Sequence, residues 1–151
     1  MKFDTVFNLD GKDQRYFAGI LANLNEIGIR KDEIYVQNMV TDYQQLESSK
    51  NKSWIKIAQY YISQRVSEFD QIDPSRKIPV LLTSELLYKA LLNKGEKRIQ
   101  AKEFYNLKTE IPIPTSANQL HRPLIPFYRH YAYSLSVKNE YALKISSLIP
   151  V

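Results

Sequence analysis

Two kinds of side chain in this sequence could do chemistry: cations set among aromatic rings, and two histidines. The chain of 151 residues contains 11 tyrosines but one tryptophan. Residues 94–105 and 121–131 interleave Lys or Arg with Tyr or Phe. Cations bind phosphates by releasing counterions, and aromatic rings stack on nucleobases. The combination favours a nucleic acid as the partner.

The positive charge is concentrated in the later part of the chain. Residues 1–49 carry five Lys or Arg and eight Asp or Glu, whereas residues 50–151 carry 16 and eight. The two parts therefore have net charges of −3 and +8, which add to the overall +5. We predict a nucleic-acid-binding set made of six cations that contact phosphates and two tyrosines that stack on bases: Lys94, Lys97, Arg98, Lys102, Arg122 and Arg129, with Tyr105 and Tyr128.

A second basic group precedes and enters a predicted helix that starts at Trp54. It consists of Lys50, Lys52 and Lys56, beside Trp54 and Tyr60. Tyr60 and Tyr61 are adjacent, so a helix can bury only one of them well. We expect some tyrosine rings to lie at the surface or against a partner.

The same pattern has other interpretations. Lysines also form the solvated faces of amphipathic helices, and exposed tyrosines beside cations also suit a protein–protein interface. A protein-interaction module, such as an inhibitor, an immunity protein or a phage accessory protein, is therefore an alternative to nucleic-acid binding. Such a module would recognise an acidic protein.

The two histidines suggest a second alternative, a metal-independent ribonuclease toxin. His121 and His130 could act as general acid and base on an RNA phosphodiester. The chain has no cysteine, which excludes thiolate zinc sites and cysteine nucleophiles. Asp70 and Asp73 are better explained as a helix end and a cap than as metal ligands. No glycine-rich phosphate loop or nucleophile elbow is present. We expect a non-catalytic protein with no metal and no cofactor.

Apolar residues at helical spacing predict the elements that position these side chains. One helix follows Asp10 and ends at Gly28, a second is capped by Asp32 and extends to residue 46, and a third spans residues 54–69. Residues 78–82 are expected to be extended. A fourth helix starts at Thr83 or Ser84 and is stopped by Gly95.

The later part of the chain is predicted to continue as helix on both sides of a proline-rich crossing. Residues 96–107 are expected to be helical, which would make Arg98 and Lys102 i,i+4 neighbours. Four prolines in residues 110–126 exclude a long helix and indicate a strap across the surface. A last helix is expected over residues 127–149. The predicted fold is mainly α, a single-domain bundle of five or six helices over residues 1–151.

No membrane partner is expected. The start of the sequence lacks the pattern of a secretory signal, and the longest apolar stretches are far below the roughly 20 residues that span a bilayer. We therefore expect a cytoplasmic protein.

In architecture and charge the chain resembles the small, helical subunit of multi-subunit CRISPR interference complexes of the Cascade type. The features that carry the resemblance are the helical pattern of residues 12–95, the basic residues 94–102, and the region of Arg122 and Arg129. The resemblance implies a compact helical bundle that stacks on other protein subunits. It also implies a basic face that contacts the target or displaced strand in an antiviral defence ribonucleoprotein. No catalytic residue follows from it.

Overall fold

The computed structural model describes residues 14–37, 39 and 54–149. Within these residues the chain is mainly α, as predicted, and also forms one two-stranded sheet. None of the described helices is long and apolar enough to cross a membrane. In chain order the elements are α2 (Gln14–Glu26), η1 (Lys31–Glu33), α3 (Trp54–Ile72), β1 (Val80–Leu82), α4 (Glu85–Leu91), α5 (Ala101–Tyr105), η3 (Thr115–Ala117), β2 (Leu124–Pro126), η4 (Tyr131–Tyr133) and α6 (Asn139–Leu148).

The helices α2 and α3 confirm two of the predictions made from apolar periodicity. Trp54, Ala58 and Ile62 recur at four-residue spacing and form the buried face of α3. The helix α2 ends where Gly28 adopts a positive φ of 75°, a conformation that glycine reaches without steric cost. Ser84 caps α4, as expected, because its hydroxyl accepts a hydrogen bond from the backbone of Leu87.

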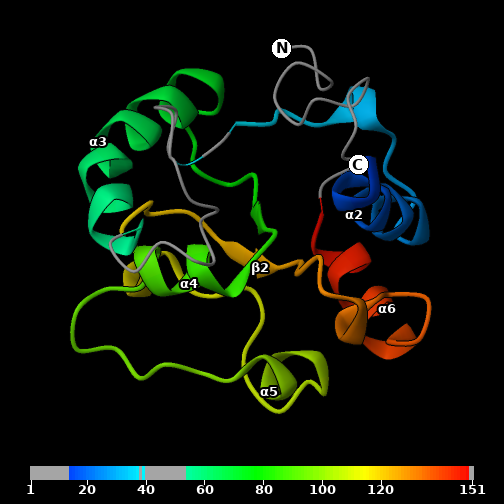
Figure 1. Cartoon of the computed structure of the whole chain (residues 1–151). Helices are drawn as coiled ribbons and strands as arrows, with labels where there is room; N and C mark the ends of the chain where they lie inside the picture. Colours follow the sequence, from blue (N-terminus) through cyan, green and yellow to red (C-terminus); the bar gives the residue numbers. More distant parts are fainter. Residues whose placement is uncertain (1–13, 38, 40–53, 150–151) are drawn as a thin grey trace.

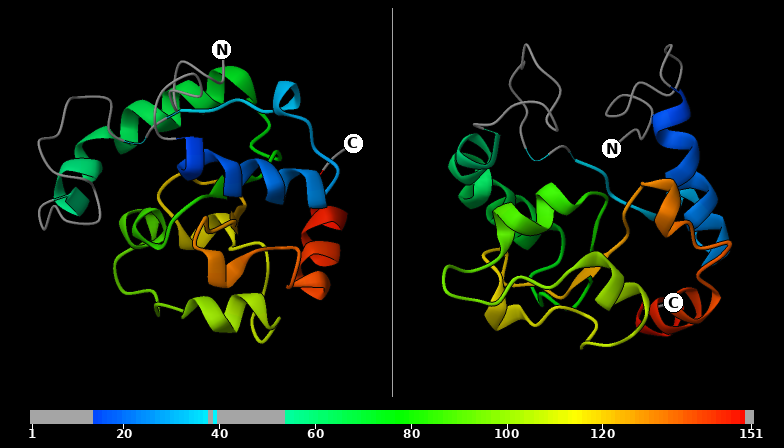
Figure 2. Two further views of the ribbon diagram at one scale, coloured as in Figure 1. Left: turned by 45° about the vertical axis from the view of Figure 1, so that its right-hand side comes forward. Right: turned by 60° about the horizontal axis from the view of Figure 1, so that its bottom comes forward.

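The centre of the fold is a parallel strand pair. β1 pairs with β2 in the register Val80–Leu124, Leu81–Ile125 and Leu82–Pro126. Figure 1 places β2 between α3 and α4 on one side and α2 and α6 on the other, and both views of Figure 2 agree. The prediction of a helical bundle is not confirmed, because the helices pack around this pair of strands.

The proline-rich residues 110–126 are not a strap on the surface, and that prediction is wrong. The prolines do exclude a long helix, but the apolar residues between them are buried, including Ile111, Ile113 and all of β2. Ile113 and Leu124 exchange two backbone hydrogen bonds, of 2.8 and 3.2 Å, which fold the segment back on itself. The segment therefore contributes apolar side chains to the hydrophobic core.

Three predicted helices are shorter than expected. Residues 96–107 contain only α5, so Arg98 precedes the helix that carries Lys102, and the predicted i,i+4 pair does not form. α4 ends at Leu91, before Gly95. The predicted helix over residues 127–149 becomes extended chain, η4 and then α6.

The helix predicted after Asp32 is limited to η1 among the described residues. Residues 34–37 are not helical, and residues 38 and 40–46 lie outside the described part of the chain. Lys50 and Lys52 also lie outside it.

Candidate nucleic-acid interface

The first part of the candidate site is the basic segment, residues 93–102, which joins α4 to α5. Its four cations, Lys94, Lys97, Arg98 and Lys102, are all exposed. The long loop that carries most of it is visible at the lower left of Figure 1.

Hydrogen bonds fix the backbone of the basic segment at several points. The backbone N–H of Asn93 donates to Ala117 O at 2.9 Å, and Asn93 Nδ2 donates to Ser116 O at 2.8 Å. Further along, Ile99 N donates to the hydroxyl of buried Tyr88 at 2.9 Å. Glu103 Oε2 accepts from Gln100 N at 3.0 Å at the start of α5. The cations therefore extend from an anchored backbone.

These four cations are not engaged by the described carboxylates. The ion pairs of the described residues use Arg30, Arg65, Arg76, Lys89 and Arg122, and none involves a cation of the basic segment. The segment holds four cations and one acid, Glu96, for a net charge of +3. Its charge is available to an external anion.

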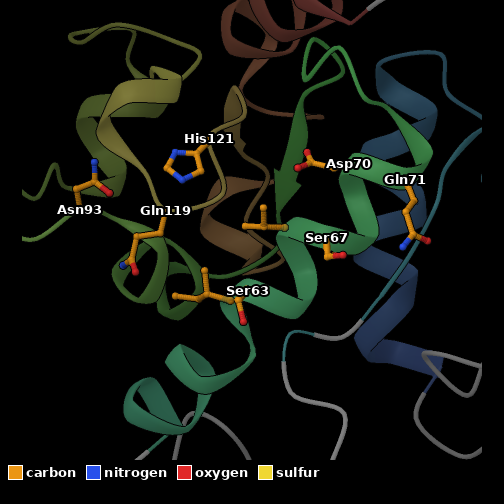
Figure 3. A pocket seen from close by; sticks show the side chains of 9 residues that line it. Ser63, Ser67, Asp70, Gln71, Asn93, Gln119 and His121 are labelled. Atoms are coloured by element: carbon orange, nitrogen blue, oxygen red, sulfur yellow. The ribbon is translucent and has the colours of Figure 1, made fainter.

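The second part of the candidate site is a groove of about 730 Å³ beside Asn93. Figure 3 shows Ser63, Ser67 and Gln71 of α3 on one side, and Asn93, Gln119 and His121 on the other; Ile62, Val66 and Asp70 complete the lining. The groove thus combines amides, hydroxyls and an imidazole with two apolar side chains.

The wall of the groove that carries Gln119 is held by hydrogen bonds. Gln119 Nε2 donates to Ala90 O and Leu92 O at 3.1 and 3.2 Å, and Gln119 N donates to Leu91 O, which ties this wall to the end of α4. His121 adopts a positive φ of 58°.

The one acid that lines the groove is already neutralised. Asp70 accepts hydrogen bonds from Arg76 at 2.7 and 3.0 Å and from Arg122 at 3.1 Å. These bonds, led by that from Arg76, hold the pKa of Asp70 below its usual range. The carboxylate stays ionised, but the guanidinium groups of Arg76 and Arg122 offset its charge, so it adds little repulsion toward an anionic ligand.

Arg122 must be removed from the predicted contacts because it is a core residue. Its side chain is only 2% exposed and lies over the Phe69 ring, 5.9 Å from the centroid. Nη1 donates to Asp73 Oδ2 at 2.8 Å, and Nη2 donates to Asp73 O at 2.6 Å. The guanidinium therefore ties the chain just before β2 to the turn that follows α3, and it is not accessible to a phosphate.

Tyr105 and Tyr128 are also removed, because each is only 3% exposed. The Tyr105 hydroxyl accepts from Tyr128 N at 2.7 Å, and the Tyr105 ring packs on Tyr133 and Tyr141, with centroids 4.7 and 4.2 Å apart. Burial raises the pKa of both phenols far above the ordinary value. Neither ring offers a free face to a nucleobase.

The remaining predicted residues fall in different places. Arg129 is half-buried, and its backbone N–H donates to Thr83 O at 2.9 Å. His121 lines the groove, whereas His130 caps η4 by accepting from Ala132 N at 3.1 Å. The groove lining therefore contains one histidine, and the predicted acid–base pair is not assembled there.

Tyr60 is an exposed aromatic residue of α3 that the predicted contact set omits. Its side chain is 85% exposed on α3, while Trp54 is buried and Tyr61 is half-buried. The adjacent Tyr60 and Tyr61 were the available signal, since a helix that buries Ile62 and Ala58 must turn one of the two tyrosines outward.

No group of three or more His, Asp or Glu residues in the described part of the chain is placed to hold a metal ion. Comparisons with known protein families, with curated proteins and with solved structures found no match for this chain. The assignment of a function therefore depends on the geometry of the basic segment and the groove.

Proposed function

We propose that this chain is a non-catalytic, sequence-tolerant nucleic-acid-binding subunit of a larger ribonucleoprotein assembly, with the basic segment as its phosphate contact. The observation that carries the proposal is the exposure of Lys94, Lys97, Arg98 and Lys102 on an anchored backbone, without ion-pair partners among the described residues. Contacts with phosphates fix the position of a protein on the nucleic acid and carry no base specificity.

The distribution of paired and unpaired cations supports this proposal. Arg65, Arg76 and Arg122 are engaged with carboxylates and stabilise the fold. The cations of the basic segment form no ion pair with the described residues, so removing them is not expected to destabilise the protein. Counterion release makes each phosphate contact favourable and sensitive to salt.

The resemblance to the small subunit of CRISPR interference complexes suggests the kind of ribonucleoprotein in which this chain would act. There the basic segment would contact the backbone of a target or displaced strand, and other surfaces would contact neighbouring subunits. Exposed apolar side chains near the C-terminal helix suit the second role: Tyr131, Val137 and Leu143. The same side chains favour the alternative of a protein-interaction module.

The experiment compares two double variants with the same change of charge. Arg98→Glu with Lys102→Glu alters the basic segment, whereas Lys77→Glu with Lys144→Glu alters exposed lysines elsewhere. Fluorescence anisotropy with labelled oligonucleotides measures affinity, and circular dichroism measures the thermal midpoint.

We expect the first variant to lose most of its affinity at an unchanged thermal midpoint, and the second to lose much less. Equal losses of affinity would mean that only net charge matters. Absence of binding by the unaltered protein, even at low salt, would favour the interaction module, and a search for its protein partner would follow.

A further inference from the structure

We infer that the groove beside the basic segment binds unpaired nucleobases, with Tyr60 as the stacking platform, so that the protein selects single strands over duplexes. The inference rests on the proposed function and adds the form of nucleic acid that the site takes. It is carried by one face of α3 and by the chemistry of the groove.

One exposed face of α3 leads into the groove. Its residues are spaced by three or four positions, which places them on one side of a helix: Lys56, Tyr60, Ser63, Ser67 and Gln71. All five are exposed, and the last three line the groove. The face carries a cation and no acid, so it can follow a polyanionic chain.

Tyr60 is not part of the groove lining but lies one helical turn before Ser63, which is. Its ring is the most exposed of the large apolar side chains in the described residues. Helix packing through Ala58 and Ile62 keeps it facing outward. A ring held in this way can stack on a base of any identity, which agrees with sequence-tolerant binding.

The groove supplies what the edges and faces of a displaced base require. The amide nitrogens of Asn93 and Gln119 already donate to backbone carbonyls, which leaves their amide oxygens to accept from a base. Ser63 and Ser67 add hydroxyls, and Ile62 and Val66 add apolar surface. Its volume of about 730 Å³ lies within the range of small-molecule sites, about 300–1,000 Å³. In a duplex the base faces are stacked and the pairing edges are occupied, so a duplex cannot use these groups.

Cations adjoin both walls of the groove in the sequence. Lys56 begins the α3 face, and Asn93 on the opposite wall is followed directly by Lys94 of the basic segment. The backbone of a single strand bound along this face would have cations within reach at the start of α3 and in the basic segment.

The test uses the full chain and a matched pair of tyrosine variants. Tyr60→Ala removes the proposed platform, and Tyr131→Ala removes a ring that is 83% exposed but lies in η4, outside the groove lining. Tyr60→Phe keeps the ring and serves as the rescue. The probes are labelled single-stranded RNA and DNA of about 15 nucleotides, close to the largest site sizes of single-strand binders, and the duplex of the same DNA sequence. Each is titrated across a salt series.

We expect tighter binding of single strands than of the duplex, for RNA, DNA or both. Tyr60→Ala should weaken single-strand binding by about 5- to 150-fold, the range for loss of one base–aromatic stack. The salt dependence of single-strand binding by Tyr60→Ala, and the affinity of this variant for the duplex, should not change. Tyr60→Phe and Tyr131→Ala should bind like the unaltered protein.

Preference for the duplex, or equal effects of Tyr60→Ala and Tyr131→Ala, would overturn the inference while leaving the proposed function in place. Absence of salt-dependent binding to every probe would overturn the proposed function and the inference together.

Discussion

The burial of Arg122 leads to a prediction that separates a folding role from a binding role. Arg122→Met keeps most of the apolar volume but removes the guanidinium that bonds to Asp73 Oδ2, Asp73 O and Asp70 Oδ1. Removing one partner of a buried ion pair costs about 3–5 kcal/mol. Because Asp73 also accepts hydrogen bonds from Ser75 and from Ile78 N, we expect the lower end, about 3 kcal/mol.

In a chain of this length, such a loss lowers the thermal midpoint by about 6–12 °C. Urea denaturation followed by the fluorescence of buried Trp54 measures the loss of free energy directly. The matched control is Arg98→Met, an exposed arginine whose replacement should change stability by less than about 0.5 kcal/mol. Where folded, Arg122→Met should bind nucleic acid with the salt dependence of the unaltered protein.

Arg122→Met with unchanged stability and lost affinity would refute this reasoning. It would restore Arg122 to the phosphate contacts that the sequence predicted. Loss of stability in Arg98→Met equal to that in Arg122→Met would also contradict it, because the two guanidinium groups would then contribute alike despite their different burial.

Asp73, two buried tyrosines and Gly95 give three further predictions. Hydrogen bonds from Ser75 and Ile78 lower the pKa of Asp73 below its ordinary value of 3.8. The ionised carboxylate therefore stabilises the fold fully above pH 3.8, and this stabilisation declines as the pH falls below 3.8. Urea midpoints measured at decreasing pH should show the decline. Burial raises the pKa of Tyr105 and Tyr141 far above 10.0, so their stabilising effect is complete below pH 10 and lost at higher pH. Absorbance titration should find both phenols un-ionised until the protein unfolds in alkali. Gly95→Ala forces a side chain onto a φ of 93°, so it should destabilise by about 1 kcal/mol or more; a thermal midpoint equal to that of the unaltered protein would contradict this.

Local sequence signals predicted those parts of the fold that depend on neighbouring residues. The periodicity of Trp54, Ala58 and Ile62 predicted α3, and Gly28 and Ser84 marked a helix end and a helix start. These features depend on spacing and backbone chemistry within a few residues, so one segment is enough to reveal them.

Features that depend on distant pairing could not be predicted in the same way. Arg122 and Asp73 are 49 residues apart, and nothing near Arg122 in the sequence shows that its charge is neutralised. Tyr105 and Tyr128 became core because α5 packs against the chain that follows β2, as the hydrogen bond between the two residues shows. The cations of residues 94–102 are exposed, which their predicted role as phosphate contacts requires. The groove beside them combines residues from α3 and from the segment after η3, which no single stretch of sequence reveals.

We propose the basic segment as the phosphate contact of this protein. The most direct test of this role is the salt dependence of oligonucleotide binding, measured for the unaltered protein and for a fourfold variant. In the variant, Gln replaces the four cations of the segment: Lys94, Lys97, Arg98 and Lys102. At about 0.7 per contact on a single strand, the slope of log affinity against log salt should become shallower by about 3 units if all four cations contact phosphates. An unchanged slope in a folded variant would contradict the claim and place the phosphate contacts elsewhere on the protein.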